Sequence, residues 1–239
     1  MIDRSQRHAA RVFAITTLLL YVVITIAFSR FYGPFLVWGD EAATARNFIA
    51  HEPLLHIYIG LAVVYGIGTI VVMAVLCVIF RPIGPGLTLF AAFARLLYAV
   101  MWFIELIDLF DALRIMRSGG YLQVFEPERL LALAGLQLAS GWDAYYIGLT
   151  FYAIGSILFS YLFFKSRYVP RVLAIFCILS ALFEGICAFA YLVDRNFGAI
   201  VSVNWYEMPA FFSEVAISIW ILVRGLRPPG ADKMVQASN

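Results

Sequence analysis

Six long apolar runs constrain the fold of this chain more than any other feature of its sequence. At about 1.5 Å per residue, roughly 20 helical residues span a hydrocarbon core about 30 Å thick. Backbone groups in hydrocarbon must be hydrogen-bonded within their own structure, so runs of this length predict α-helices rather than the alternating strands of a membrane barrel. The runs extend approximately from Ala10 to Phe31, Leu54 to Phe80, Leu87 to Leu113, Ala144 to Phe164, Val172 to Val193 and Pro209 to Val223. The last run is the shortest, and we expect its helix to begin nearer Trp205.

The composition points to lipid as the main solvent. Hydrophobic residues make up 63% of the 239 residues and charged residues 13%, whereas soluble domains carry about 25% charged residues. We therefore predict an all-α, polytopic integral membrane bundle of about six transmembrane helices, with residues 1–228 as a single domain and 229–239 as a disordered cytoplasmic tail. The predicted partner is the lipid bilayer. A net charge of +2, with no basic run that alternates with aromatics, argues against a nucleic-acid partner.

Lysine and arginine are shared unevenly between the two sides of the predicted bundle. Ten belong to the side that carries both termini: Arg4, Arg7, Arg11, Arg81, Lys165, Arg167, Arg171, Arg224, Arg227 and Lys233. Six belong to the other side: Arg30, Arg46, Arg114, Arg117, Arg129 and Arg195. Because positively charged loops tend to stay in the cytoplasm, we expect both termini to be cytoplasmic. The first run is longer than the hydrophobic region of a signal peptide, so we expect it to be retained.

Two connections on the other side carry helix signals of their own. Gly39-Asp40 is typical of an N-cap and predicts a helix from Glu41 to Ile49. Glu126-Pro127 places proline at a first helical position and predicts a second helix through Leu138. That second segment is too apolar to stand in water. We expect both to be short interfacial helices in the outer loops.

Three stretches of sequence carry a family resemblance. They are Ser5-Gln6-Arg7, the stretch from Gly39 to Ile49, and the stretch from Tyr161 to Leu173 with its basic turn Tyr168-Val169-Pro170-Arg171. In these phrases, and in the order of elements over nearly the whole chain, the sequence resembles a bacterial family of multi-pass membrane proteins known as domain of unknown function 4386. The resemblance implies a helical membrane fold in the bacterial cytoplasmic (inner) membrane, and it implies no activity. The chain departs from the family pattern after Arg95, where no acidic residue follows until Glu105.

The third run contains charged residues at helical spacing. Arg95, Tyr98, Trp102, Glu105 and Asp108 follow one another at steps of three or four residues, which places them on one face of a helix. A charge at the centre of a bilayer costs at least about 2.5 to 3.5 kcal/mol, so this face is expected to point toward protein.

Two further glutamates are expected at the depth of this face. Counted at 1.5 Å per residue, Arg95 lies about 12 Å and Glu184 about 18 Å from one surface, and Glu214 lies about 13 Å from the other. We predict a cavity that opens outward, with Arg95, Glu184 and Glu214 as its floor. The acidic residues at its mouth would be Glu105, Asp108, Asp111, Asp143 and Glu207. In the alternative interpretation, the floor is a structural ion pair between helices and the mouth acids are solvated helix ends.

Motifs for metal binding and catalysis are weak. His51 and His56 are five residues apart with Pro53 between them, so they lie on different faces of a helix and predict no zinc site. The sequence has no Gly-x-Ser-x-Gly motif and no phosphate-binding glycine loop. Cys77, Cys177 and Cys187 all lie in apolar runs and predict buried thiols rather than a redox or metal motif. No cofactor is predicted.

The charged face leaves three functional interpretations open. The favoured one is a non-enzymatic bundle that binds an apolar or amphipathic small ligand, or a membrane partner protein, at Arg95, Glu184 and Glu214. The first alternative is a proton- or cation-coupled transporter, although no inverted repeat is detected. The second is a membrane enzyme that modifies lipid, against which the missing pair of nucleophile and base argues.

Overall fold

The computed structural model describes residues 2–117, 119–194 and 196–227, and every regular element in this part of the chain is a helix. The elements are α1 (Arg4–Phe31), η1 (Gly33–Phe35), α2 (Glu41–Ala50), α3 (Glu52–Phe80), α4 (Pro85–Met116), η2 (Gly120–Val124), α5 (Pro127–Ser166), α6 (Arg171–Val193), α7 (Phe197–Ile200) and α8 (Val203–Arg224). Six helices, α1, α3, α4, α5, α6 and α8, are long and apolar enough to cross a membrane. The predicted fold class is confirmed, and the last span begins at Trp205 as expected. The predicted tail at 229–239 lies outside the described residues.

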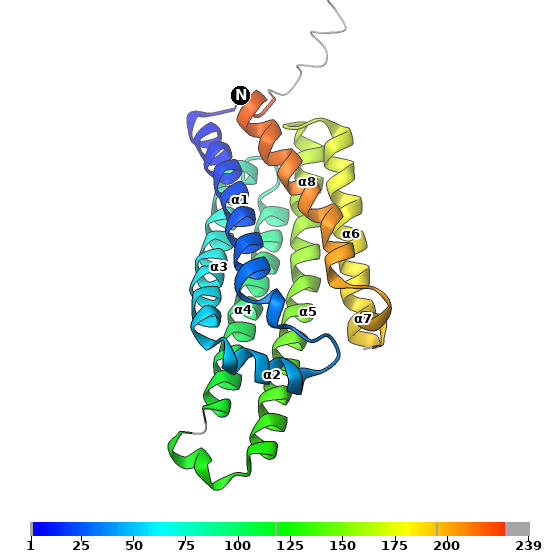
Figure 1. Cartoon of the computed structure of the whole chain (residues 1–239). Coiled ribbons are helices and arrows are strands. Elements are labelled where there is room, and N and C mark those ends of the chain that lie inside the picture. The colour runs from blue at the N-terminus through cyan, green and yellow to red at the C-terminus, as the bar shows by residue number, and fades with distance from the viewer. Residues whose placement is uncertain (1, 118, 195, 228–239) are drawn as a thin grey trace, which may run out of the picture.

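The six long helices stand side by side in one bundle (Figure 1). Helix α5 packs most extensively, against α4 and α6, while α1 packs against α3 and α8. Glycines allow close approach: a β-carbon at Gly148 would lie 3.0 Å from Met101 Cβ on α4, and one at Gly185 would lie 2.8 Å from Ala153 Cβ. We call the end that holds the start of α1 and the end of α8 the terminal end. The opposite end, with α2, η2 and α7, is the loop end.

The terminal end is tied together by the turn between α5 and α6. The Gln6 side-chain amide donates hydrogen bonds to the carbonyl of Ile79 at 2.8 Å and to Tyr168 Oη at 3.1 Å. The backbone N–H of Arg227 donates to the carbonyl of Tyr168 at 2.9 Å. Asp3 begins α1 in a capping box with Gln6, in which each side chain accepts from the backbone N–H of the other. The start of α1 and the segment after α8 are therefore fixed to the same loop.

The loop end confirms one of the two predicted short helices and corrects the other. Asp40 accepts a hydrogen bond from the Ala43 N–H at 2.8 Å and starts α2 at Glu41, as its N-cap signal predicted. The separate helix predicted from Pro127 to Leu138 does not exist, because α5 continues without a break to Ser166. No proline interrupts this stretch, and a single mid-helix glycine costs only about 1 kcal/mol. Gly141 also packs closely on α4, where a β-carbon would lie 3.4 Å from Asp108 Cβ.

Candidate functional site

A buried ion pair joins α4 to α8 near the middle of the bundle. Arg95 Nη2 donates to Glu214 Oε1 at 2.6 Å. Tyr152 Oη on α5 donates to the same oxygen at 2.7 Å, and Tyr21 Oη on α1 donates to Oε2 at 2.9 Å. We call these four side chains the Glu214 cluster. Because three donors surround one carboxylate, the cluster joins four helices and compensates the burial of both charges.

The position of Arg95 depends on a glycine and on an aromatic ring. Its guanidinium carbon lies 3.8 Å from the centroid of the Tyr152 ring, in a cation–π arrangement. A β-carbon at Gly155, one turn further along α5, would lie 2.7 Å from Arg95 Cγ and 3.1 Å from the Ala91 carbonyl oxygen. Glycine therefore provides the space in which the arginine stem runs. Tyr152 and Gly155, which are three residues apart on α5, together hold the Arg95 side chain between α4 and α5.

A cavity of about 260 Å³ lies on the loop side of this cluster. All six spanning helices contribute to its wall, and most of the lining side chains that carry rings are tyrosines. The rings are those of Tyr21, Phe28, Tyr32, Tyr58, Tyr65, Tyr98, Trp102, Trp142, Tyr145, Tyr152 and Phe211. We call it the aromatic cavity. Trp102 is fixed by its indole N–H, which donates to the Ala62 carbonyl at 2.9 Å, and the hydroxyls of Tyr65 and Tyr98 lie 3.3 Å apart.

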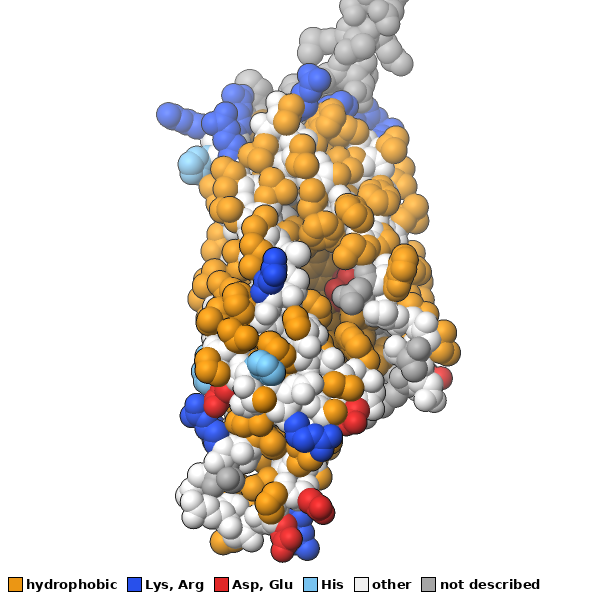
Figure 2. All heavy atoms as spheres, in the orientation of Figure 1, with side chains coloured by type: hydrophobic (Ala, Val, Ile, Leu, Met, Phe, Trp, Pro, Cys, Tyr) orange, Lys and Arg blue, Asp and Glu red, His pale blue; other side chains and the backbone are white. Residues whose placement is uncertain are grey.

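The aromatic cavity opens sideways between α1 and α8. Thr25 and Ser29 on α1 and Met208 on α8 belong to its lining and are exposed at the surface. Figure 2 shows a hollow between these two helices, with apolar side chains around most of it, a basic side chain beside it and a carboxylate visible inside. Its neighbours on the surface include Ile26 and Phe212, which are 49% and 58% exposed. The mouth thus lies between two helices that are long and apolar enough to cross a membrane.

Three carboxylates line the aromatic cavity. Glu207 on α8 accepts a hydrogen bond from Tyr145 Oη. Glu184 on α6 is only 3% exposed, and its Oε2 has no hydrogen-bond partner among the described residues. The buried Oε2 of Glu105 on α4 likewise has none within the described part of the chain. Among the described lining residues none is lysine, arginine or histidine.

The structure brings together some of the predicted site residues and separates others. The stripe on α4 does face the bundle: Tyr98, Trp102 and Asp108 are buried, and Arg95 and Glu105 are partly buried. Arg95 pairs with Glu214. Glu184 was predicted to share this floor, and it lines the aromatic cavity instead, where its Oε2 accepts no hydrogen bond from the arginine.

The predicted acidic mouth is divided among several places. Glu105 and Glu207 line the aromatic cavity. Asp108 instead accepts a hydrogen bond from Gln137 between α4 and α5, and Asp111 pairs with Arg114 at 2.5 Å near the surface. Asp143 lines a different groove at the loop end, beside Trp38 and Trp205. Asp108 lies away from the cavity because the continuous α5 packs along this part of α4 and places Gln137 against it.

Sequence reasoning singled out Tyr98 and Trp102 on α4 but not the other six tyrosines that line the cavity. Two pairs are seven residues apart, Tyr58 with Tyr65 on α3 and Tyr145 with Tyr152 on α5. Residues seven apart lie on one face of a helix, two turns from each other. Hydroxyl-bearing rings repeated at this spacing inside an aliphatic span were therefore a readable signal of a polar internal face.

Metal ligands are not grouped in the described residues, where no three His, Cys, Asp or Glu side chains gather as for a metal ion. The prediction that the chain needs no cofactor stays a prediction.

Comparison with known proteins identifies one family. The sequence profile of a family described as a domain of unknown function (DUF4386) matches residues 14–225. This is the family that the three stretches of sequence resembled, and the match covers all six spanning helices. No curated protein and no solved structure matches the chain.

Proposed function

We propose that this chain, which belongs to the DUF4386 family of unknown function, binds an amphipathic small molecule that enters the aromatic cavity sideways from the lipid. The observation that carries the proposal is the mouth between α1 and α8, which joins a polar cavity to the apolar surface of the bundle. A ligand that reaches such a mouth must dissolve in the membrane. A ligand that forms hydrogen bonds with the carboxylates and tyrosine hydroxyls of the interior must also carry a polar group.

The size of the aromatic cavity fits one end of such a molecule. Its volume of about 260 Å³ exceeds the roughly 150 Å³ of an engineered protein cavity that holds benzene. Ligand pockets for whole drug-sized molecules are larger, about 300 to 1,000 Å³. A head group can therefore lie inside, against the tyrosines and carboxylates, while an apolar chain extends through the mouth into the bilayer.

The membrane and orientation belong to the same proposal. Lysine and arginine side chains gather at the terminal end in Figure 2. On the face shown, no acidic side chain is visible beside them. The positive-inside rule then supports a cytoplasmic terminal end in a bacterial inner membrane, with the aromatic cavity in the outer half of the bundle.

Binding of single-chain amphiphiles tests the function. The purified protein is inserted into nanodiscs of an uncharged glycolipid and titrated with three probes that share a twelve-carbon chain: dodecyltrimethylammonium, dodecyl sulfate and octaethylene glycol monododecyl ether. Native mass spectrometry counts the molecules retained. We expect saturable binding of one molecule per chain for at least one probe.

A pair of variants on α1 locates that binding. Thr25→Trp places a large ring at the exposed rim of the mouth and should abolish the saturable binding. Leu19→Trp places the same ring at a position that is 60% exposed and outside the cavity lining, so it should bind like the wild type. Saturable binding of none of the three probes, or equal binding by the two variants, would overturn the proposed function.

A second candidate function is a coupled transporter. A smaller cavity of about 30 Å³ lies against the other side of the Glu214 cluster, lined by Arg95, Glu214, Ser156, Ser160 and Ser213. The cluster thus contributes a wall to two cavities, as a closed gate does. Proteoliposomes that show proton flux dependent on Glu214, lost in Glu214→Gln, would favour this function over binding alone.

A further inference from the structure

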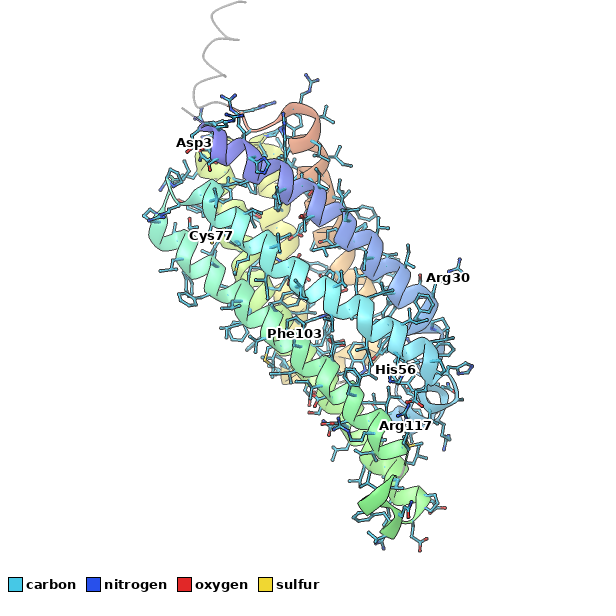
Figure 3. The ribbon with its side chains drawn as sticks, turned by 90° about the vertical axis from the view of Figure 1, so that its left-hand side faces the viewer. Asp3, Arg30, His56, Cys77, Phe103 and Arg117 are labelled. Carbon is cyan, nitrogen blue, oxygen red and sulfur yellow. The ribbon has the colours of Figure 1, made fainter. Side chains whose placement is uncertain are left out.

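The charge of the aromatic cavity narrows the class of ligand. Glu105, Glu184 and Glu207 line it, and no described lining residue carries a positive charge. The nearest cation in the bundle interior, Arg95, is already paired with Glu214 at 2.6 Å. Arg30, at the loop end of α1, points away from the bundle in Figure 3. Among the described residues, the lining of the cavity therefore has three carboxylates and no cation.

Two of these carboxylates each have one buried oxygen without a hydrogen-bond partner in the described part of the chain. The Oε2 atoms of Glu105 and Glu184 are buried, and neither has a hydrogen-bond partner among the described residues. Glu184 is 97% shielded from solvent, being 3% exposed. Burying an acceptor of this kind costs free energy unless a ligand or a proton completes it. Such oxygens favour a ligand group that donates a hydrogen bond or carries a positive charge.

The rings supply the second half of a cation site. Tyr98, Trp102 and Tyr145 line the same space, with Trp102 and Tyr145 centroids 6.1 Å apart and Tyr98 and Trp102 centroids 6.4 Å apart. The faces of tyrosine and tryptophan attract organic cations, and several such rings around one cavity are the usual recognition of ammonium groups. An aromatic lining without carboxylates would suit any apolar group. Carboxylates without rings would suit water or a metal ion.

We propose that the aromatic cavity binds the ammonium head of an amphipathic organic cation, with its apolar chain directed through the mouth between α1 and α8. This inference rests on the proposed function and specifies its ligand class. Two sources share this chemistry: a phospholipid with an ammonium head group, and a free single-chain amine. Anionic and uncharged amphiphiles of the same length should bind less well.

The three-probe titration tests the class of ligand. Dodecyltrimethylammonium should bind at least about tenfold more tightly than dodecyl sulfate or the uncharged ether, because its charge is attracted by the carboxylates and by the ring faces; tenfold corresponds to about 1.4 kcal/mol. Glu184→Gln and Glu105→Gln should each weaken the cation about tenfold and leave the uncharged ether within about twofold. The matched control is Glu128→Gln, which removes the same charge from an exposed position at the start of α5.

The outcomes separate this inference from the proposed function. Saturable binding with equal affinity for all three probes, or a preference for dodecyl sulfate, would overturn the ligand class and leave the binding function intact. A cation preference that both glutamate variants retain would also overturn it. Where the preference holds, discs that contain phosphatidylethanolamine distinguish the sources: displacement of the probe assigns the site to a lipid head group, and its persistence assigns the site to a free amine.

Discussion

In the terminal half of the bundle, the ring of Phe80 lies 4.6 Å from that of Phe163, edge to face, and stacks on Tyr168 at 6.3 Å. Phe80 is fully buried and packs with aliphatic side chains such as Ile79 and Leu162. In the loop half, the rings of Tyr58 and Tyr98 are also buried from the surface, but they line the aromatic cavity. The same kind of residue thus fills space in one half and encloses space in the other.

This difference shows where the bundle is closely packed and where it encloses open space. Tyrosine hydroxyls need partners when buried, and phenylalanine rings do not, so a closed core favours phenylalanine. Seven of the chain's 13 tyrosines line the aromatic cavity. The Glu214 cluster lies between the two halves. A substitution in the Glu214 cluster should therefore lower the free energy of unfolding more than a substitution in the cavity wall does.

The largest expected effect is that of Arg95→Leu. The substitution leaves Glu214, whose side chain is 19% exposed, without its cation, and breaking a largely buried pair in this way costs about 3 kcal/mol or slightly more. Reversible unfolding in mixed micelles should show this loss, together with a lower folding yield. Arg114→Leu is the matched control, because Arg114 is 68% exposed in its pair with Asp111. If Arg95→Leu were as stable as the wild type, the Glu214 cluster would not be what holds the two halves of the bundle together.

The next effect separates the two halves directly. Phe80→Ala should destabilise the protein by about 3 kcal/mol, since the ring is fully buried and its neighbours cannot collapse into the space. Phe211→Ala deletes the same atoms beside the aromatic cavity, where the ring already borders open space, and should cost roughly half as much. The same unfolding assay compares them. Equal losses would mean that the loop half packs as tightly as the terminal half.

A polar contact in the terminal half gives a smaller effect. Gln6→Leu removes two buried hydrogen bonds and leaves the Ile79 carbonyl and Tyr168 hydroxyl without their donor, at a cost of about 1 to 3 kcal/mol. Ser5→Leu is a control at the neighbouring exposed position. The variant should also increase protease cleavage near the end of α8, because Tyr168 joins that end to α1. Unchanged stability and unchanged cleavage would contradict this view of the terminal end.

The comparison also shows what the sequence could predict. Length and apolarity predicted six spans, because a membrane forces each run into a helix regardless of its neighbours. Local signals succeeded where one side chain decides the outcome, as at Asp40. They failed at Leu138, where continuation of α5 depends on packing against α4. Helical spacing identified the buried face of α4, and depth counting found the Arg95 and Glu214 partners.

The division of the acids could not be predicted in the same way. Glu184 and Glu214 lie at similar depths, and only the rotation of α6 and α8 in the bundle decides which one meets Arg95. That rotation is set by packing between helices that are distant in sequence, such as Gly185 against Ala153. The lateral mouth is a property of two helices together, α1 and α8, and no single stretch of sequence contains it.

The smallest effect is expected in the wall of the aromatic cavity. Tyr65→Phe removes a hydroxyl that lies 3.3 Å from the Tyr98 hydroxyl, at a distance typical of a weak hydrogen bond. Because both hydroxyls border open space, Tyr98 keeps access to other partners, and the loss should be no more than about 0.5 kcal/mol. The unfolding assay used for Gln6→Leu measures it. A loss as large as that of Gln6→Leu would show that the cavity wall is as tightly bonded as the terminal core, and the contrast between the two halves would then rest on ring packing alone.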